Sequence, residues 1–203
     1  MYFTQLEIKA SVKVPKSKNF KTMSNLKVTK PEEANPISKG IFEGMKKQMG
    51  MVPNVYAAIG NSGLALKAVM AIQENLGEGE FDGKEQEAIA LSVAEANACD
   101  YCLSAHTAVG KMKGLTEDQT IAIRNGSIED HKLKALSDLA KAITETRGFP
   151  DQKFFDAFFD AGYNQTALSE LIVLVALNTI TNYTNHIAKT EIDFPLAPSL
   201  LEA

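Results

Sequence analysis

The 203-residue sequence predicts an all-α protein, a single helical domain of seven or eight helices with a basic N-terminal extension. Two observations support this fold class. Apolar residues recur three or four positions apart over most of the chain, which is the spacing of one helix face. Turn and capping residues separate these segments, and only residues 1–15 alternate polar and apolar side chains as a strand would.

The helices are expected between clear start and stop signals. The segment Pro31–Pro36 reads as a linker or helix entry. Asp82 can cap a helix that starts near Lys84, and Thr116–Gln119 has the capping-box pattern. The longest apolar run, Leu171–Leu177, is expected to be a buried helix rather than a membrane span. The expected helical segments are 41–52, 54–76 with a break at 60–63, 84–97, 100–113, 117–126, 133–147, 152–161 with Asp151 as its cap, and 168–189.

Charge and composition divide the chain into a basic extension over 1–36, a helical domain over 37–190 and a tail over 191–203. Residues 1–30 hold seven lysines and one acid, a charge of +6, and the rest holds 14 basic and 24 acidic side chains, a charge of −10. The sum is the net charge of −4. An acidic body without a basic patch argues against nucleic-acid binding. Met23 is an alternative start, but a basic tail over 1–22 is preferred.

Nothing in the sequence indicates export or a membrane span. No stretch approaches the roughly 20 apolar residues that cross a bilayer, and the N-terminal segment lacks the continuous apolar region of a signal peptide. A cytoplasmic protein is expected, and there a close cysteine pair is more often catalytic, redox-sensing or metal-binding than structural. No GxGxxG pattern or phosphate loop occurs, so no bound organic cofactor is expected.

The chemistry is expected at the only two cysteines, in Cys99-Asp-Tyr-Cys102-Leu-Ser-Ala-His106. Residues three or four apart on a helix are neighbours. The two sulfur atoms can therefore form a disulfide, and the imidazole of His106 can accept the proton of Cys102 directly or through one water. A helix N-terminus at Cys99 would further stabilise a thiolate. Thiolate, sulfenic acid and disulfide can follow in succession at such a pair.

Glu87 precedes Cys99 with eleven residues between them. The pattern Glu-x11-Cys-x2-Cys-x3-His resembles the signature of the alkylhydroperoxidase-D-like, peroxidase-related branch of the carboxymuconolactone decarboxylase family. The resemblance implies that Cys102 attacks a hydroperoxide, that Cys99 resolves the sulfenic acid to a disulfide, and that His106 and Glu87 relay protons. It also implies an antioxidant enzyme with a hydroperoxide substrate, a dithiol or disulfide reductant protein as partner, and a homo-oligomer (dimer, trimer or hexamer).

Two features of the sequence bear on this resemblance. Better-characterised members have a histidine directly before the second cysteine, where this sequence has Tyr101. A phenol with its ordinary pKa near 10 is a poor proton shuttle at neutral pH. In addition, one straight helix from Glu87 to Cys99 would separate the two by about 18 Å. We therefore predict a break in the chain near 97–99, which would allow Glu87 to return to the site.

Three other interpretations of the motif stay open. The family includes disulfide reductases that use the same pair in reverse. The pair could also be a redox sensor whose disulfide changes assembly without turnover. Finally, Cys99, Cys102 and His106 could be three zinc ligands, although a structural zinc site usually needs a fourth.

The last expected helix carries polar side chains among its apolar ones, namely Asn178, Asn182, Asn185 and His186. Such groups on an apolar helix usually satisfy buried backbone atoms or lie in an interface. The sequence therefore predicts a structural role for them. The third histidine, His131, follows two acids near a helix start and is expected to be solvated.

Overall fold

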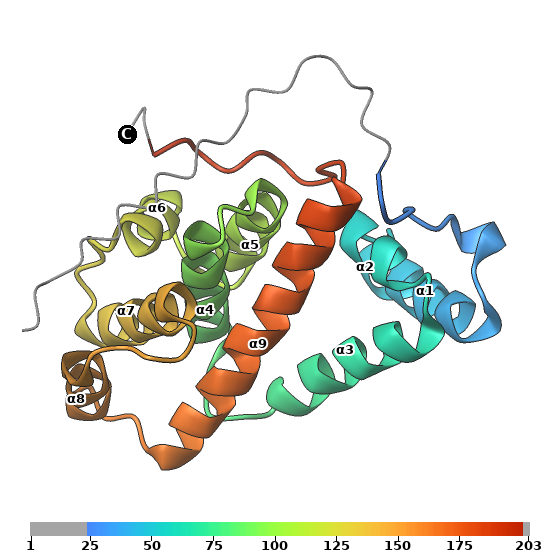
Figure 1. Ribbon diagram of the computed structural model, residues 1–203. Coiled ribbons are helices and arrows are strands. Elements are labelled where there is room, and N and C mark those ends of the chain that lie inside the picture. The colour runs from blue at the N-terminus through green and yellow to red at the C-terminus, as the bar shows by residue number, and fades with distance from the viewer. Residues whose placement is uncertain (1–23, 201–203) are drawn as a thin grey trace, which may run out of the picture.

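The computed structural model describes residues 24–200, and every regular element in this range is a helix. The predicted all-α fold class is confirmed. The 3-10 helix η1 and nine α-helices follow one another as η1 (Pro31–Glu33), α1 (Pro36–Met49), α2 (Asn54–Ile59), α3 (Gly63–Leu76), α4 (Gly83–Ala96), α5 (Asp100–Met112), α6 (Glu117–Asn125), α7 (His131–Thr146), α8 (Gln152–Asp160) and α9 (Gln165–Ala188) (Figure 1).

The expected number of seven or eight helices is too low for this part of the chain. The segment expected as one broken helix over 54–76 forms two helices, because Ser62 caps α3 with its side chain and makes the short α2 a separate element. The last helix begins at Gln165 rather than near Leu168, because the Asn164 side chain accepts the backbone N–H of Ala167.

The predicted caps have mixed outcomes. Asp82 and Thr116 both form capping boxes, each with the side chain three residues into its helix. Asp151 stands at the N-cap of α8, but its side chain accepts no capping hydrogen bond.

Residues 24–200 include no helix that is long and apolar enough to cross a membrane.

The helix α4 lies at the centre of the molecule and contacts α5, α6, α7 and α9. In the view of Figure 1, α9 runs across the front, with α1 to α3 on one side and α5 to α8 on the other. The inner side chains of α4 are fully buried, including Ala88, Ile89, Leu91 and Val93. Burying both flanks of one helix in this way makes α4 a rigid platform for any group that it carries.

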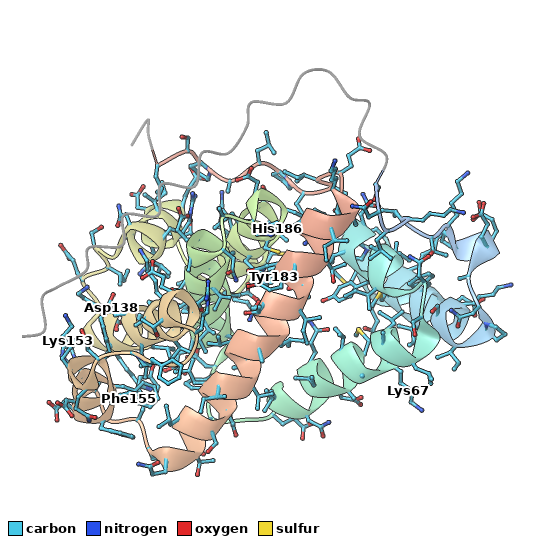
Figure 2. All side chains as sticks on the ribbon, in the orientation of Figure 1. Lys67, Asp138, Lys153, Phe155, Tyr183 and His186 are labelled. Carbon is cyan, nitrogen blue, oxygen red and sulfur yellow. The ribbon has the colours of Figure 1, made fainter. Side chains whose placement is uncertain are left out.

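The apolar run 171–177 lies on α9, as a helix that is buried on one side and exposed on the other. Leu171, Leu174 and Leu177 face the core, but Ile172 and Val173 are exposed. The exposed side continues along the helix to Tyr183 and His186, which Figure 2 labels on α9. The helix therefore has two apolar faces, and residues 24–200 cover one of them.

The segments that flank the helices also pack on the body. Thr29 donates its backbone N–H to the carbonyl of Ala57 at 3.1 Å. After α9, the Asp193 side chain accepts the backbone N–H of Asn54 at 2.8 Å, and the Phe194 ring lies edge-on to Tyr101. The basic segment over 1–23 lies outside the described residues, and the division into extension, domain and tail stays a prediction.

Candidate active site

The helix is interrupted between α4 and α5, where the sequence predicts a break. The helix α4 ends at Ala96, Ala98 has a positive φ of 52°, and α5 begins at Asp100. The backbone N–H of Cys99 then bonds to the carbonyl of Ala94 at 2.9 Å, which closes the end of α4 in the manner of a Schellman motif. The predicted break is confirmed, and α5 returns along α4.

The close approach of these two helices brings Glu87 back to the cysteine motif. A Cβ atom on Gly110 of α5 would lie 3.6 Å from the Cβ of Glu87 and 3.1 Å from a methyl group of Leu115. The glycine therefore allows α5 to lie directly against the start of α4.

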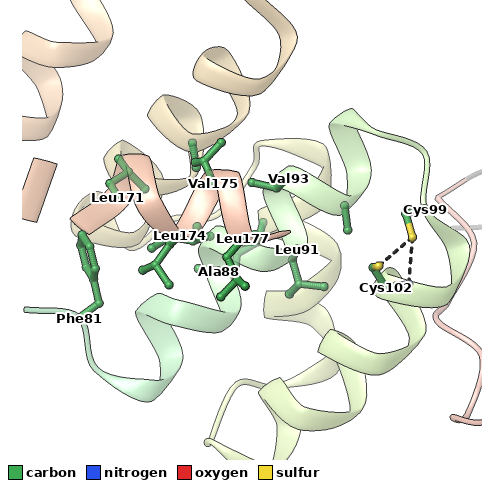
Figure 3. Close-up of a cluster of buried hydrophobic side chains, with 14 of the residues drawn as sticks. Phe81, Ala88, Leu91, Val93, Cys99, Cys102, Leu171, Leu174, Val175 and Leu177 are labelled. Atoms are coloured by element: carbon green, nitrogen blue, oxygen red, sulfur yellow. Dashed lines mark hydrogen bonds between the residues drawn. The ribbon is translucent and has the colours of Figure 1, made fainter. Parts of the chain in front are cut away.

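The two cysteines are free thiols at the N-terminus of α5, with their sulfur atoms 2.7 Å apart. Cys99 is the N-cap residue, and its sulfur accepts the backbone N–H of Cys102 at 3.4 Å. Figure 3 shows the pair at one end of the buried apolar cluster formed by α4 and α9. Both side chains are buried, so the sulfurs exchange protons with each other and with their polar neighbours rather than with bulk water.

The two thiols differ in acidity. The hydrogen bond between the two sulfurs lowers the pKa of Cys99, assisted by the backbone N–H of Cys102 and the amide of Asn185. The same hydrogen bond, together with burial, raises the pKa of Cys102. The first proton of the pair therefore leaves from Cys99, whose position at a helix N-terminus also favours a negative charge.

His106, one turn after Cys102, forms an ion pair with Glu87. Its Nδ1 atom lies 2.7 Å from Oε2 of Glu87, and the two side chains are only 26% and 13% exposed. Burial alone would lower the pKa of His106, but the neighbouring carboxylate outweighs burial, and the net pKa is raised. Nε2 is the ring nitrogen left for proton exchange with the cysteines or a substrate.

A Glu87→Gln variant is expected to lower the pKa of His106 by about one unit or more. The amide can keep a hydrogen bond to Nδ1 but removes the negative charge, which leaves burial to disfavour the imidazolium. In the wild type, His106 therefore stays protonated to a higher pH than an ordinary histidine. An NMR titration of the ring signals measures this directly, with His131 and His186 as internal controls. An unchanged midpoint for His106 would contradict the proposed ion pair.

Asn185 of α9 is a site residue that sequence reasoning did not identify. Its Nδ2 atom lies 3.2 Å from the sulfur of Cys102 and 3.9 Å from that of Cys99. Asn182, one turn earlier, accepts a hydrogen bond from Asn97 at 2.9 Å and so ties α9 to the break between α4 and α5. The signal was present in the sequence as three asparagines spaced four and three apart, which places them on one buried face.

Tyr101 stabilises the packing of the chain and is poorly suited to transferring protons. Its hydroxyl accepts the backbone N–H of Val55 at 3.3 Å. Burial, followed by a hydrogen bond with Asp193, raises the pKa of the phenol far above its ordinary value. The hydroxyl therefore stays protonated at neutral pH, as the sequence led us to expect.

A cavity of about 240 Å³ adjoins these groups. Polar lining comes from Glu87, Cys102, His106 and Asn185, together with the hydroxyl of Tyr56. The remaining walls are mostly apolar side chains, contributed by Met49, Val55, Val109, Leu177 and Phe194. Within residues 24–200, no three histidine, cysteine or acidic side chains are arranged to hold a metal ion, so the zinc interpretation finds no ligand set there.

The sequence profile of the carboxymuconolactone decarboxylase family matches residues 64–145, a segment that includes Glu87, both cysteines and His106. This central segment, less than half of the chain, is similar to the carboxymuconolactone decarboxylase family. Asn185, Tyr56 and the segment after α9 lie outside the matched residues, so part of the cavity wall comes from elements beyond the family segment. A comparison with curated proteins gives no match.

Solved structures show that the fold of this chain is similar to that of alkylhydroperoxidase-D-like proteins. A peroxidase-related protein with an alkylhydroperoxidase AhpD core, from Ralstonia eutropha JMP134, has a TM-score of 0.75 at 17% identity, covering 85% of this chain and 93% of its own. A peroxidase-related protein from Silicibacter sp. TM1040 has a TM-score of 0.72 at 21% identity, covering 87% and 95%. The debrominase Bmp8, in complex with 2,3,4-tribromopyrrole, has 0.67 at 19% identity, covering 78% and 86%. At these identities the likeness shows the fold alone.

Proposed function

We propose that the protein is a thiol-dependent oxidoreductase that reduces hydroperoxides through a sulfenic acid and disulfide cycle at Cys99 and Cys102. The observation that carries the proposal is the dithiol itself, two free sulfurs 2.7 Å apart, of which Cys102 borders a cavity shared with the His106–Glu87 pair. A buried dithiol beside a proton donor is the arrangement that two-electron peroxide reduction needs.

The first step oxidises Cys102. The proton of its thiol passes to Cys99 over the 2.7 Å that separates the sulfurs, leaving a thiolate at Cys102. That thiolate attacks one peroxide oxygen, so an S–O bond forms and the O–O bond breaks. The sulfur loses two electrons, and the departing alkoxide takes a proton from the His106 imidazolium. The raised pKa of His106 fits this role, because it keeps the ring protonated to a higher pH than an ordinary histidine.

The second step closes the disulfide. The sulfur of Cys99 attacks the sulfenic sulfur of Cys102, so an S–S bond forms and the S–O bond breaks. Hydroxide leaves as water with the proton of Cys99. An external dithiol then supplies two electrons and two protons. One proton restores the thiol of Cys102 and the other returns to His106, which leaves Cys99 as the thiolate with which the cycle began.

The reductant has a separate approach to the pair. Cys99 lines a second cavity of about 310 Å³, on the other side of the dithiol, together with His186 and Lys189. We expect the reductant to approach from this second cavity, although Cys99 itself is buried, so a small movement of its neighbours has to expose the sulfur. The partner expected there is a dithiol carrier, either a small molecule or a protein.

The Cys102 cavity favours an organic hydroperoxide over hydrogen peroxide. Its volume of about 240 Å³ would hold roughly eight waters. Apolar walls of this kind bind an alkyl or aryl group and leave the hydroperoxide for the polar end.

Steady-state turnover tests this function. We expect the wild-type protein to consume tert-butyl and cumene hydroperoxides over many cycles with a small dithiol or reduced thioredoxin as donor, with lower kcat/KM for hydrogen peroxide. One equivalent of peroxide consumed per disulfide formed, with no further cycling, would contradict the enzyme and favour the redox sensor.

Disulfide reduction is the second candidate function. The specific observation in its favour is the lowered pKa of Cys99, because that sulfur would be the ionised nucleophile toward a disulfide in the second cavity. Turnover of disulfide substrates without any peroxide consumption would favour this candidate.

A further inference from the structure

The outward face of α9 has a regular pattern of its own. Six exposed residues on this face lie four, three, four, three and four positions apart. They are Ser169, Val173, Ala176, Ile180, Tyr183 and Ile187, which we call the α9 seam. Because a spacing of alternating threes and fours averages 3.5 residues, it is the pattern of a helix that packs along its length against another helix.

Within the described residues the seam is separate from the core face of the same helix. Leu171, Leu174 and Leu177 fill the core, and Asn178 and Asn185 point into the site region. The seam residues are exposed, so they add nothing to the packing of residues 24–200. A second apolar stripe with coiled-coil spacing is therefore explained by a partner helix rather than by the monomer fold.

We propose that the partner is the α9 helix of a second copy of this chain, packed antiparallel about a two-fold axis near Asn178. In an antiparallel pair, a and d positions of one helix meet d and a positions of the other. Residues whose numbers sum to 356 then face each other. Val173 meets Tyr183, Ala176 meets Ile180, and Ser169 meets Ile187, each in both directions.

This register is self-complementary in size. Each layer joins one smaller side chain to one larger one: serine to isoleucine, valine to tyrosine, and alanine to isoleucine. Alternating large and small residues across a helix interface lets the layers interdigitate without voids. A two-fold axis repeats every layer, so the single sequence supplies both halves of the fit.

Charge also permits self-association at this face. Glu170 is the only acidic side chain on α9, and no lysine or arginine lies between Gln165 and Ala188. That carboxylate accepts the backbone N–H of Glu80 at 2.7 Å within its own chain. Only one unit of the net charge of −4 therefore lies on α9, and two copies can meet here with few like charges opposing them.

The exposed area fits the apolar centre of an interface. The larger side chains on and beside the seam are 40% to 54% exposed: Ile172, Val173, Ile180, Tyr183 and Ile187. At that exposure they present an apolar patch on the order of a few hundred Å², as large as the largest patch on a typical monomer. A specific interface covers roughly 800 Å² on each partner, so polar flanks such as Thr184 would form its rim.

Light scattering after gel filtration of the full-length protein tests the proposal. The wild type is expected at twice the 22.0 kDa of one chain, or at an even multiple of it. An Ile180→Glu variant should weaken the pairing by roughly 100-fold or more, since it places charges in the central layers. Met112→Glu is the matched control, because it adds the same charge at an 83% exposed site on α5 and should leave the mass unchanged.

A mixing experiment tests the register. Ala176→Lys alone should also give single chains, but a mixture of the Ile180→Glu and Ala176→Lys proteins should pair, because residues 176 and 180 face each other across the axis. A monomeric wild type, an Ile180→Glu protein with the wild-type mass, or a mixture that stays monomeric would each overturn the proposal. Circular dichroism of every variant separates loss of pairing from loss of folding.

Discussion

A Cys102→Ser protein is expected to lose hydroperoxide turnover by about 10³-fold or more, because a serine hydroxyl at this site has no thiolate to attack the O–O bond. The effect should be the largest of any single substitution in the cavity. The fold should be retained, since the oxygen is smaller than the sulfur and the position is at a helix N-terminus with its backbone bonds intact.

The Cys99→Ser protein provides the matched comparison. It also cannot cycle, but it should react once with a hydroperoxide and stop as a sulfenic acid on Cys102. Trapping with dimedone followed by mass spectrometry detects that product, which the Cys102→Ser protein should not form. If the Cys99→Ser protein cycles normally, or if the adduct forms on Cys99 in the Cys102→Ser protein, the assigned roles of the two sulfurs are wrong.

A Phe158→Ala substitution is expected to lower the free energy of unfolding by about 3–5 kcal/mol. Phe158 is fully buried, and its ring stacks on that of Tyr163 at a centroid distance of 4.4 Å. Removing it leaves a cavity beneath α8 and also loosens Tyr163, whose hydroxyl donates to the buried carboxylate of Glu85 at 2.8 Å.

Chemical denaturation measures this effect, and Phe149→Ala is the matched control. Phe149 is 84% exposed, so the same truncation there should change the unfolding free energy by less than about 0.5 kcal/mol. Equal effects at the two positions would mean that the stacked cluster under α8 does not stabilise the fold as described. Turnover per folded molecule should be unchanged in both variants, because neither ring borders the cavity beside Cys102.

Local rules predicted most of the helices. Capping residues such as Asp82 and Thr116 act within one turn, so their effect can be recognised without knowing the fold. The break before Cys99 was also predictable, because the helix rise forbids a straight connection to Glu87. The α2 helix was missed as a separate element, since a six-residue helix has too little periodicity to distinguish it from the start of a longer one.

Long-range contacts account for what the sequence did not predict. Asn185 is 83 residues from Cys102 and reaches the sulfur only because α9 crosses the α4–α5 hairpin. The exposure of one side of the run 171–177 could likewise not be predicted, because the sequence of an apolar run does not show which of its faces packs against the rest of the chain. The relative acidity of the two thiols depends on the hydrogen bonds around each sulfur, and these can be assigned only from the distances in the three-dimensional structure.

In the hairpin of α4 and α5, the number of residues between Glu87 and Cys99 determines where the Glu87 carboxylate lies. The Glu87 carboxylate lies on α4, and its partner His106 lies on α5. Their contact therefore depends on the rotation of α4 about its axis as well as on its length. Deleting one residue within α4 would turn Glu87 by roughly 100° about the helix axis and carry it away from His106. Adding or removing about one helical turn would restore the direction of Glu87 but would move it about 5.4 Å along the axis, so the eleven intervening positions set both the direction and the reach of the carboxylate.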